Sequence, residues 1–306
     1  MSKQRILVLG GEGMLGSMVA DYFSRAPQFE VTATTRSRSS APKIDELQWL
    51  DFDANAAAAP EAFASVDWVI NCIGIIKPLI HDDNAAEVER ATIINALFPH
   101  RLARWTEAKC RVLQIATDCV YSGTKGRYIE PDVHDPLDVY GKTKSIGEVH
   151  APHVHHLRCS IIGPEAKSPK SLLEWFLGQS SNAAVNGFTN HRWNGVTTLH
   201  FAKLCAGIVK DKLELPHVQH VIPDGDLTKC VMLEQFARCF NRDDIRINPT
   251  EAGVIIDRTL GTKDELLNDR LWRAAGYESA PSVPQMIEEL SKFNYRFNGR
   301  ASEVGA

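Results

Sequence analysis

The sequence lacks an excess of basic residues, a membrane-spanning segment and a signal peptide. Its 34 Lys and Arg are outnumbered by 38 Asp and Glu, so the net charge of −4 leaves no basic excess for nucleic acid or an anionic membrane. The longest apolar stretch, VDWVINCIGII, is far shorter than a membrane span, and the apolar run in MSKQRILVLGG is too short for a signal peptide. We therefore expect a globular, cytoplasmic protein that binds neither nucleic acid nor membranes.

Cysteines with the spacing of a metal site or a disulfide framework are also missing. The seven cysteines are scattered with no C-x-x-C pair, and their odd number does not suit paired disulfides, so a reducing compartment is expected. The histidine-rich segment HAPHVHH (150–156) lacks the acidic or thiolate neighbours and the i, i+4 helical spacing of usual metal sites. We predict no metal site.

The first half of the chain alternates short apolar runs with longer helical patterns. Continuous apolar runs separated by helices predict a parallel sheet covered on both faces, which is a doubly wound α/β (Rossmann) fold. The predicted strands are RILVLG (5–10), EVTATT (30–35), LQWLDF (47–52), VDWVINC (66–72), RVLQIAT (111–117) and HLRCSIIG (156–163).

After about residue 163 the rhythm changes to amphipathic helices with few strands. One of these helices, in TKDELLNDRLWRAAGY, is predicted to open with a T-x-x-E capping box at Thr262 and Glu265. We expect a dinucleotide-binding domain and a smaller, mixed α/β substrate-binding lobe. The domain comprises residues 1–165 with a returning segment near 195–222, and the lobe comprises residues 166–194 and 223–306.

A glycine-rich segment, GGEGMLGSMVADYF, stands directly after the first predicted strand. Its G-x-x-G-x-x-G spacing permits a tight turn, brings a pyrophosphate against the backbone and lets the next helix pack closely on the strand. The helix amino terminus then offers N–H groups to the anion. A dinucleotide site is favoured over an ordinary glycine-rich turn, with contacts from Gly10, Gly13, Met14, Leu15 and Gly16.

The end of the second predicted strand indicates which dinucleotide is bound. The sequence there reads TTRSRS, without the acidic residue that would bind the ribose 2′-hydroxyl of NAD. Arg36, with Ser37 or Arg38, suits a 2′-phosphate, so NADP(H) is preferred and NAD(H) stays possible. The alternative is that Arg36 is merely solvated. Asp51, at the end of the third strand, is a weaker candidate for the adenine amino group.

The fourth and fifth predicted strands end in residues that should share one edge of the sheet. Ligands of doubly wound sheets bind outside the carboxyl ends of the strands, so Cys72, Ile73 and Gly74 should border the cofactor. Thr117 would present a hydroxyl at the same edge, where a reacting carbonyl oxygen needs a donor. The alternative for Thr117 is a turn or capping residue.

The segment DPLDVYGKTKSIGE (135–148) places Tyr140 and Lys144 four residues apart. On a helix this spacing puts both side chains on one face, so the ammonium can lie near the phenol. Such a neighbour favours the phenolate and lowers a tyrosine pKa from near 10 towards neutrality. Tyr140 would then serve as a proton donor or acceptor; the alternative is an ordinary surface helix.

Together these residues resemble the extended short-chain dehydrogenase/reductase family. Within it, ATDCVYSGTKGRYIEPDVHDPLDVYGKTKSIGE is most similar to the branch of dTDP-4-dehydrorhamnose reductases, which reduce a 4-keto-6-deoxy sugar nucleotide. The resemblance is carried by G-x-x-G-x-x-G at 10–16, NCIG at 71–74, Asn95 in INALFPHRLA, Thr117-Asp118, and Y-x-x-x-K at 140–144.

The resemblance implies a role for each matching residue. Tyr140 would protonate the new alkoxide, and Thr117 would hydrogen-bond the reacting oxygen. Lys144 would hold the nicotinamide ribose and tune Tyr140, with Asn95 supporting the proton relay behind it. It also implies a possible homodimer, because family members often pair through helices that flank the catalytic segment.

Two departures from the family pattern narrow the chemistry. Related sugar-nucleotide dehydratases carry Thr-Asp-Glu, but this chain has Cys119 in the third place, which disfavours dehydration. Some of the reductases hold magnesium through glutamates near a dimer interface, and the position matching one of them is Met18. The resemblance therefore adds no metal.

Substrate recognition is expected from the second lobe and from loops above the sheet edge. GFTNHRWNG (187–195) reads as a loop with an aromatic ring, amides and a cation, suited to a base or sugar and a diphosphate. Arg192 and Trp193 are the first candidates, followed by Lys77 and His81. Trp193 has the alternative of a buried anchor between lobes.

Three functions follow from the sequence. The first is NADPH-dependent reduction of the 4-keto group of a nucleotide-linked 6-deoxy sugar. The second is an NAD-retaining nucleotide-sugar epimerase that uses the same tyrosine and lysine, against which Arg36 counts. The third is a non-catalytic NADP-binding regulator, which the joint presence of Tyr140 and Lys144 disfavours.

Overall fold

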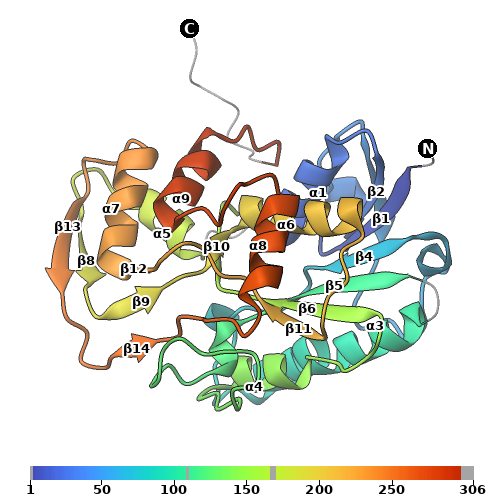
Figure 1. Cartoon of the computed structure of the whole chain (residues 1–306), viewed down its shortest axis with the longest axis horizontal. Coiled ribbons are helices and arrows are strands. Elements are labelled where there is room, and N and C mark those ends of the chain that lie inside the picture. Colours follow the sequence, from blue (N-terminus) through green and yellow to red (C-terminus); the bar gives the residue numbers. More distant parts are fainter. Residues whose placement is uncertain (1–2, 108–109, 166–169, 298–306) are drawn as a thin grey trace, which may run out of the picture.

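A seven-stranded parallel sheet with helices on both faces forms the larger part of the structure, a computed structural model that describes residues 3–107, 110–165 and 170–297 (Figure 1). The strand order is β11-β6-β5-β4-β1-β2-β3, so the direction of winding reverses beside β1. This confirms the predicted doubly wound α/β fold. The strands are β1 (Gln4–Leu9), β2 (Phe29–Thr35), β3 (Leu47–Asp51), β4 (Trp68–Asn71), β5 (Arg111–Ala116), β6 (Val154–Arg158) and β11 (Val218–His220).

Strand β1 illustrates how the apolar runs build a core on each face of the sheet. Successive side chains of a strand point to opposite faces, so Ile6 and Val8 join the apolar cluster that contains Phe23. Leu7 joins the other cluster, with Phe98. A strand buried on both faces needs no polar alternation, which explains its continuous apolar sequence.

Helices α1 and α6 lie above the sheet in Figure 1, and α3 and α4 lie below it. The helices of this part are α1 (Met14–Ser24), α2 (Ala85–Ala91), the π-helical turn η4 (Thr92–Leu97), α3 (Phe98–Thr106), α4 (Val139–Ile146), α6 (Thr198–Asp211) and α8 (Glu265–Ala274). Short 3-10 turns are η1 (Arg38–Ser40), η2 (Glu61–Ser65), η3 (Lys77–Leu79) and η5 (Asp118–Val120).

The remaining elements form a smaller part at the left of Figure 1. Two short sheets, ordered β12-β9-β14 and β13-β8, lie with α5, α7 and α9, while β10 pairs with β7. Their bounds are β7 (Ile161–Ile162), α5 (Leu172–Leu177), β8 (Ala184–Phe188), β9 (His191–Trp193), β10 (Val196–Thr197), β12 (Leu227–Thr228), α7 (Lys229–Cys239), β13 (Arg246–Thr250), β14 (Ile256–Asp257) and α9 (Val283–Lys292).

The start of helix α8 differs from its prediction. The N-cap is Asp264, whose carboxylate accepts a hydrogen bond from Leu267 N at 2.8 Å, so the capping box at Thr262 and Glu265 is wrong. Thr262 is used elsewhere, because its hydroxyl donates to the Glu130 carboxylate at 2.7 Å. A long-range contact thus replaced the local one.

Two other segments also differ from their predictions. HLRCSIIG, expected as one strand, is divided between β6 in the main sheet and β7, which pairs with β10. GFTNHRWNG, expected as a loop, contains the end of β8 and all of β9. Both differences come from pairing with distant strands.

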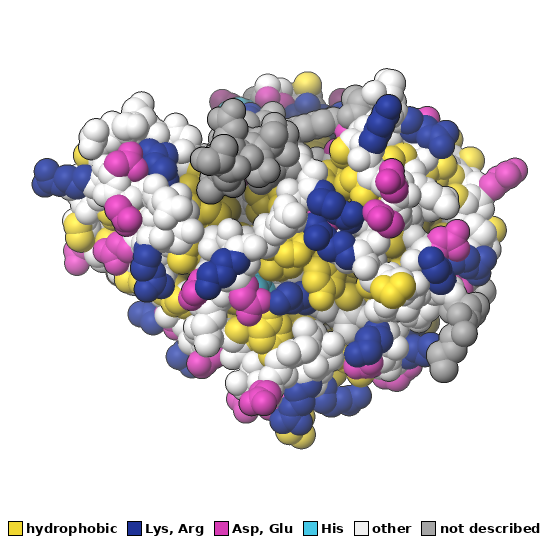
Figure 2. Space-filling model, turned by 90° about the horizontal axis from the view of Figure 1, so that it is seen from above, with side chains coloured by type: hydrophobic (Ala, Val, Ile, Leu, Met, Phe, Trp, Pro, Cys, Tyr) yellow, Lys and Arg dark blue, Asp and Glu magenta, His cyan; other side chains and the backbone are white. Residues whose placement is uncertain are grey.

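Within the described ranges, no helix is long and apolar enough to cross a membrane. Figure 2 looks down on the upper side of the molecule and shows acidic and basic side chains interspersed among apolar and neutral ones. This face therefore carries no continuous field of one charge.

Candidate active site

The turn between β1 and α1 has the geometry that its glycines predict. Gly10 has a φ of +79°, which favours glycine, and its N–H donates to Thr34 Oγ1 at 2.9 Å. A Cβ on Gly16 would lie 2.1 Å from the Gly10 carbonyl oxygen. Gly13 is the N-cap of α1 and has no side chain to cap it, so the first turn keeps N–H groups for an anion. These residues fit a bound pyrophosphate.

The side chains of this turn are not all equally accessible. Met14 is partly exposed, whereas Leu15 is 4% exposed and belongs to the apolar core. The predicted contact of Leu15 with a cofactor is therefore limited to its backbone.

The ends of β2 and β3 form the region predicted to bind the adenosine phosphate. Arg36 and Ser37 are exposed, in agreement with both the phosphate-binding and the solvated alternatives. Asp51 accepts a hydrogen bond from Arg38 N at 2.9 Å, so its carboxylate already holds the turn after β2. Glu12, which the sequence analysis missed, accepts from Thr35 Oγ1 at 2.6 Å and brings a carboxylate to the same edge.

Helix α4 positions Tyr140 over the end of β5. Asp138 caps the helix by accepting from Gly141 N at 2.8 Å, and Lys77 pairs with the same carboxylate at 2.6 Å. Tyr140 lies beside Thr117, whose hydroxyl donates to Asp118 at 3.2 Å. Thr117 additionally caps η5 by accepting from Cys119 N at 3.2 Å, which matches its capping alternative.

The pKa of Tyr140 differs from its prediction. Burial raises the pKa above its ordinary value, and Cys119 acts in the same direction, while the neighbouring Thr117 hydroxyl opposes them. The prediction that Lys144 lowers the pKa of Tyr140 is wrong for this structure. The Lys144 ammonium instead donates a hydrogen bond to the Ile115 carbonyl at 3.1 Å. Tyr140 is therefore a protonated phenol at neutral pH.

Lys144 is buried, with 8% of its surface exposed. Burial lowers its pKa to about 8, although Glu148 acts in the opposite direction. Its charge is thus maintained at neutral pH and is sensitive to mild alkali.

Asn95 connects α4 to the loop after β4. It lies in the π-helical turn η4, a distortion frequent at functional sites. Its side chain accepts from Ile75 N at 2.8 Å and donates to Ile75 O at 3.0 Å. A Cβ on Gly74 would lie 3.4 Å from Asn95 Oδ1 and 4.0 Å from Lys144 Nζ. The structure therefore brings Gly74, Asn95 and Lys144 together.

The loop after β4 also meets the glycine turn. A Cβ on Gly10 would lie 3.0 Å from the Ile73 side chain and 3.4 Å from the Cys72 backbone. Burial raises the pKa of the Cys72 thiol, and Lys144 opposes that shift, which places the thiol near the ammonium. The predicted cofactor and catalytic residues are thus contiguous at one edge of the sheet.

The predicted substrate residues are more dispersed. Arg192 is half-exposed and pairs with Asp226, and the exposed His81 ring bonds to Glu87 at 2.7 Å. Trp193 is 4% exposed and its indole N–H donates to Ser160 Oγ at 2.8 Å. This position matches the buried-anchor alternative for Trp193.

Two cations near Asp118 were missed by the sequence analysis. Arg258 and Lys229 come from the second half of the chain, and both stabilise the ionised form of the buried Asp118 carboxyl. Burial outweighs them and raises the pKa of Asp118. Asp118 was recognised only as part of a motif, and no local pattern marks the two cations.

A buried ionic network lies behind α4. Arg158 is 1% exposed and donates to the Glu148 carboxylate at 2.5 and 3.1 Å. It also donates to Tyr121 at 2.7 Å and contacts the rings of His220 at 2.6 Å and His134 at 2.9 Å. The network joins the end of α4 to β6 and β11 and so fixes the helix that carries Tyr140.

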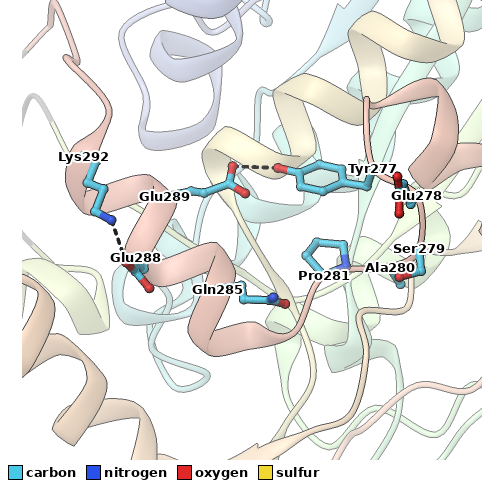
Figure 3. A pocket seen from close by; sticks show the side chains of 9 residues that line it. All are labelled: Tyr277, Glu278, Ser279, Ala280, Pro281, Gln285, Glu288, Glu289 and Lys292. Atoms are coloured by element: carbon cyan, nitrogen blue, oxygen red, sulfur yellow. Dashed lines mark hydrogen bonds and ion pairs between the residues drawn. The ribbon is translucent and has the colours of Figure 1, made fainter.

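Two surface cavities lie away from these residues. One, of about 350 Å³, is lined by residues 277–281 and by α9; in it Tyr277 donates to Glu289 at 2.7 Å and Lys292 pairs with Glu288 at 2.6 Å (Figure 3). The other, of about 490 Å³, lies between α3 and residues 149–153. Neither is lined by a predicted site residue.

The fold and the residues gathered at its carboxyl edge define a Rossmann-like α/β protein. Residues 4–162, more than half of the chain, match the family model described as the RmlD substrate binding domain, and the chain belongs to this family. The resemblance to dTDP-4-dehydrorhamnose reductases is thereby confirmed at the level of the family.

The relatives found by sequence include proteins with two different names. Methionine adenosyltransferase 2 subunit beta of Xenopus tropicalis is 26% identical over 281 residues, covering 88% of this chain and 80% of the relative. A dTDP-4-dehydrorhamnose reductase of Mycolicibacterium smegmatis is 33% identical over 149 residues, 47% of this chain and 40% of the relative. The Bacillus anthracis dTDP-4-dehydrorhamnose reductase in complex with NADP has a TM-score of 0.72 at 15% identity, covering 94% and 98% of the two chains. At 15% identity, the likeness to the Bacillus anthracis structure shows a shared fold.

Proposed function

We propose that this protein is an NADPH-dependent reductase of the 4-keto group of a nucleotide-linked 6-deoxy sugar, as the names of several relatives suggest. The observation that carries the proposal is the placement of Tyr140 beside Thr117, with Lys144 one helical turn further along α4. A hydroxyl beside a protonated phenol is the arrangement that a carbonyl oxygen needs as it becomes an alcohol.

The glycine turn and the loop after β4 would hold the cofactor. Gly10, Gly13 and Gly16 leave room for a pyrophosphate, and Gly74 is exposed beside Lys144. Arg36 and Ser37 would take the 2′-phosphate of NADP. The Bacillus anthracis relative was solved in complex with NADP, which supports this choice of cofactor. When bound, NADPH supplies the hydride.

The chain's own residues supply the proton. Tyr140, protonated at neutral pH, donates to the oxygen of the reduced ketone, while Thr117 turns its hydroxyl from Asp118 to the same oxygen. Lys144, cationic below a pH of about 8, lies beside Gly74 and would hold the nicotinamide ribose. Asn95 holds the loop after β4 and so keeps Lys144 in place.

Substrate contacts belong to the same proposal. Lys77, paired with the cap of α4, and Arg192, half-exposed on β9, are cations suited to a nucleotide diphosphate. The side chains of His81 and Trp193 are hydrogen-bonded to Glu87 and Ser160, respectively. They would contribute to substrate binding through the shape of the site. A cytoplasmic location and a possible homodimer belong to the same proposal.

A second candidate is a regulatory subunit that binds NADP without catalysis. The match that covers 88% of this chain, to a protein named as a subunit of methionine adenosyltransferase, favours it. The arrangement of Tyr140, Thr117 and Lys144 favours the reductase instead.

The variant Tyr140→Phe tests the reductase proposal. Loss of the proton donor should reduce turnover of the keto-sugar by roughly 100-fold or more while cofactor affinity stays unchanged. Turnover is measured as NADPH consumption and affinity by cofactor fluorescence. Unchanged turnover would exclude Tyr140 as the acid and, with it, this mechanism.

A further inference from the structure

Lys229 is a cation in an unusual place. It is the first residue of α7, where the helix dipole disfavours a positive charge, and it follows the capping residue Thr228. Its ammonium lies 5.4 Å from the centre of the Trp193 ring. Helix formation alone does not explain a lysine at this position.

The ammonium reaches from the second lobe to the catalytic edge. The groups that favour its charged form are Asp118 and Cys119, which directly follow Thr117. Burial nonetheless lowers the pKa of Lys229 to about 8, although the side chain keeps some access to solvent. The Lys229 side chain is therefore covered by protein on the side of Trp193 and Asp118 and keeps a second side accessible to solvent.

Its protein partners compensate this charge incompletely. Asp118 is shared with Arg258, and across the described residues Lys229 has no ion pair within 4.0 Å. Arg258 is itself fixed, because its guanidinium donates to Tyr121 O at 2.8 Å. A partly buried ammonium without a close counter-ion is costly unless a ligand supplies one.

We propose that Lys229 binds an anionic oxygen of the nucleotide-sugar substrate. This inference rests on the proposed function, since it places the group beside Thr117 and Tyr140. The oxygen has two chemical sources, the diphosphate or an acidic group on the sugar. An acidic group would change the expected sugar from a neutral 6-deoxy sugar to one with a carboxylate near the reacting carbon.

Lys229→Gln and Lys229→Arg test the proposal by binding rather than by turnover. The wild type and both variants, each saturated with NADP⁺, are titrated calorimetrically with uridine, UDP, UDP-glucose and UDP-glucuronate, and with the matching thymidine series. Lys142→Gln, which removes an exposed lysine of α4, is the control for a general change of charge.

Loss of a charge-assisted hydrogen bond should weaken binding of the anionic ligands roughly 10- to 100-fold in Lys229→Gln, with recovery in Lys229→Arg. The uncharged nucleosides should bind as before. A loss shared by UDP and both sugars identifies the diphosphate, and a loss confined to UDP-glucuronate identifies a carboxylate on the sugar.

Three results would overturn the proposal. They are wild-type affinities in Lys229→Gln, an equal loss for the nucleosides, or a failure of Lys229→Arg to restore binding. Failure of the proposed reductase function would be recognised by a different result. If the wild type binds these ligands but oxidises no NADPH with any keto-sugar, the reductase proposal is rejected, while the binding data still measure the role of Lys229.

Discussion

The charge of Lys144 depends on pH within the range in which the protein would be assayed. Its pKa of about 8 means that the ammonium is present below that pH and is lost as the pH rises through it. Tyr140 remains a phenol over the same range, because its pKa is raised. Of these two groups, Lys144 is the one whose titration should limit the reaction at moderately alkaline pH.

We therefore expect kcat/KM for reduction to fall above a pH of about 8, approaching tenfold per pH unit. The measurement is a pH profile of kcat/KM at saturating NADPH. Because Lys229 has a similar pKa, the profile is repeated with Lys229→Arg, in which the alkaline limb should persist. A flat profile to pH 9.5 would contradict the role of Lys144.

The sequence was sufficient to identify residues whose partners are local or whose motif is specific. Tyr140 and Lys144 share one helix, and Thr117 directly follows β5, so their placement at one edge of the sheet followed from spacing and fold. Lys229 and Arg258 lie more than 100 residues away from Asp118 and belong to no motif. Only the folded chain brings them to the catalytic edge.

At the scale of elements, the contact between β1 and α1 depends on the absence of a side chain. A Cβ on Gly16 would be 2.1 Å from the Gly10 carbonyl oxygen, which is backbone and cannot move aside cheaply. The approach of the helix to the turn therefore sets the shape of the pyrophosphate site.

The variant Gly16→Ala should lose about 1–3 kcal/mol of stability, because the added methyl group overpacks the turn. It should also weaken NADPH binding, since α1 must move away from Gly10. Gly253→Ala is the matched control, because its Cβ would meet nothing within 4 Å. Thermal melts and NADPH titrations of both variants check this; equal behaviour of the two would refute the close-packing argument.

Element types were predictable where the pattern was strong and failed where partners were remote. Strands β1 to β6 of the main sheet were recognised from their apolar runs. Strand β9 was predicted as a loop, because its three residues are defined by pairing with β12 and β14. The cap of α8 was misplaced for a related reason, since Glu130 binds Thr262.

At the scale of the whole molecule, the Arg158 network joins segments from across the chain. Burial acts to raise the pKa of Glu148, but its pair with Arg158 lowers it overall. The carboxylate therefore depends on Arg158 for its charge, and it lies at the end of the helix that carries Tyr140.

Arg158→Met should reduce the free energy of unfolding by about 3–5 kcal/mol, because it leaves a buried carboxylate without its partner. Arg158→Met combined with Glu148→Leu should regain part of that loss. Lys292→Gln, which breaks the exposed pair with Glu288, is the control and should show no measurable loss. Urea unfolding measures all three, and equal curves for Arg158→Met and the control would count against the network.

The most direct measurement of the central claim is the stoichiometry of NADPH oxidation. Purified protein is mixed with dTDP-, UDP- and GDP-linked 4-keto-6-deoxy sugars, with NADH in parallel, and NADPH loss is compared with reduced sugar formed. A reductase that uses Tyr140 and Lys144 consumes one NADPH for each alcohol produced from one of these sugars. Interconversion of sugars without net NADPH loss, or cofactor binding with no turnover of any sugar, would contradict the claim.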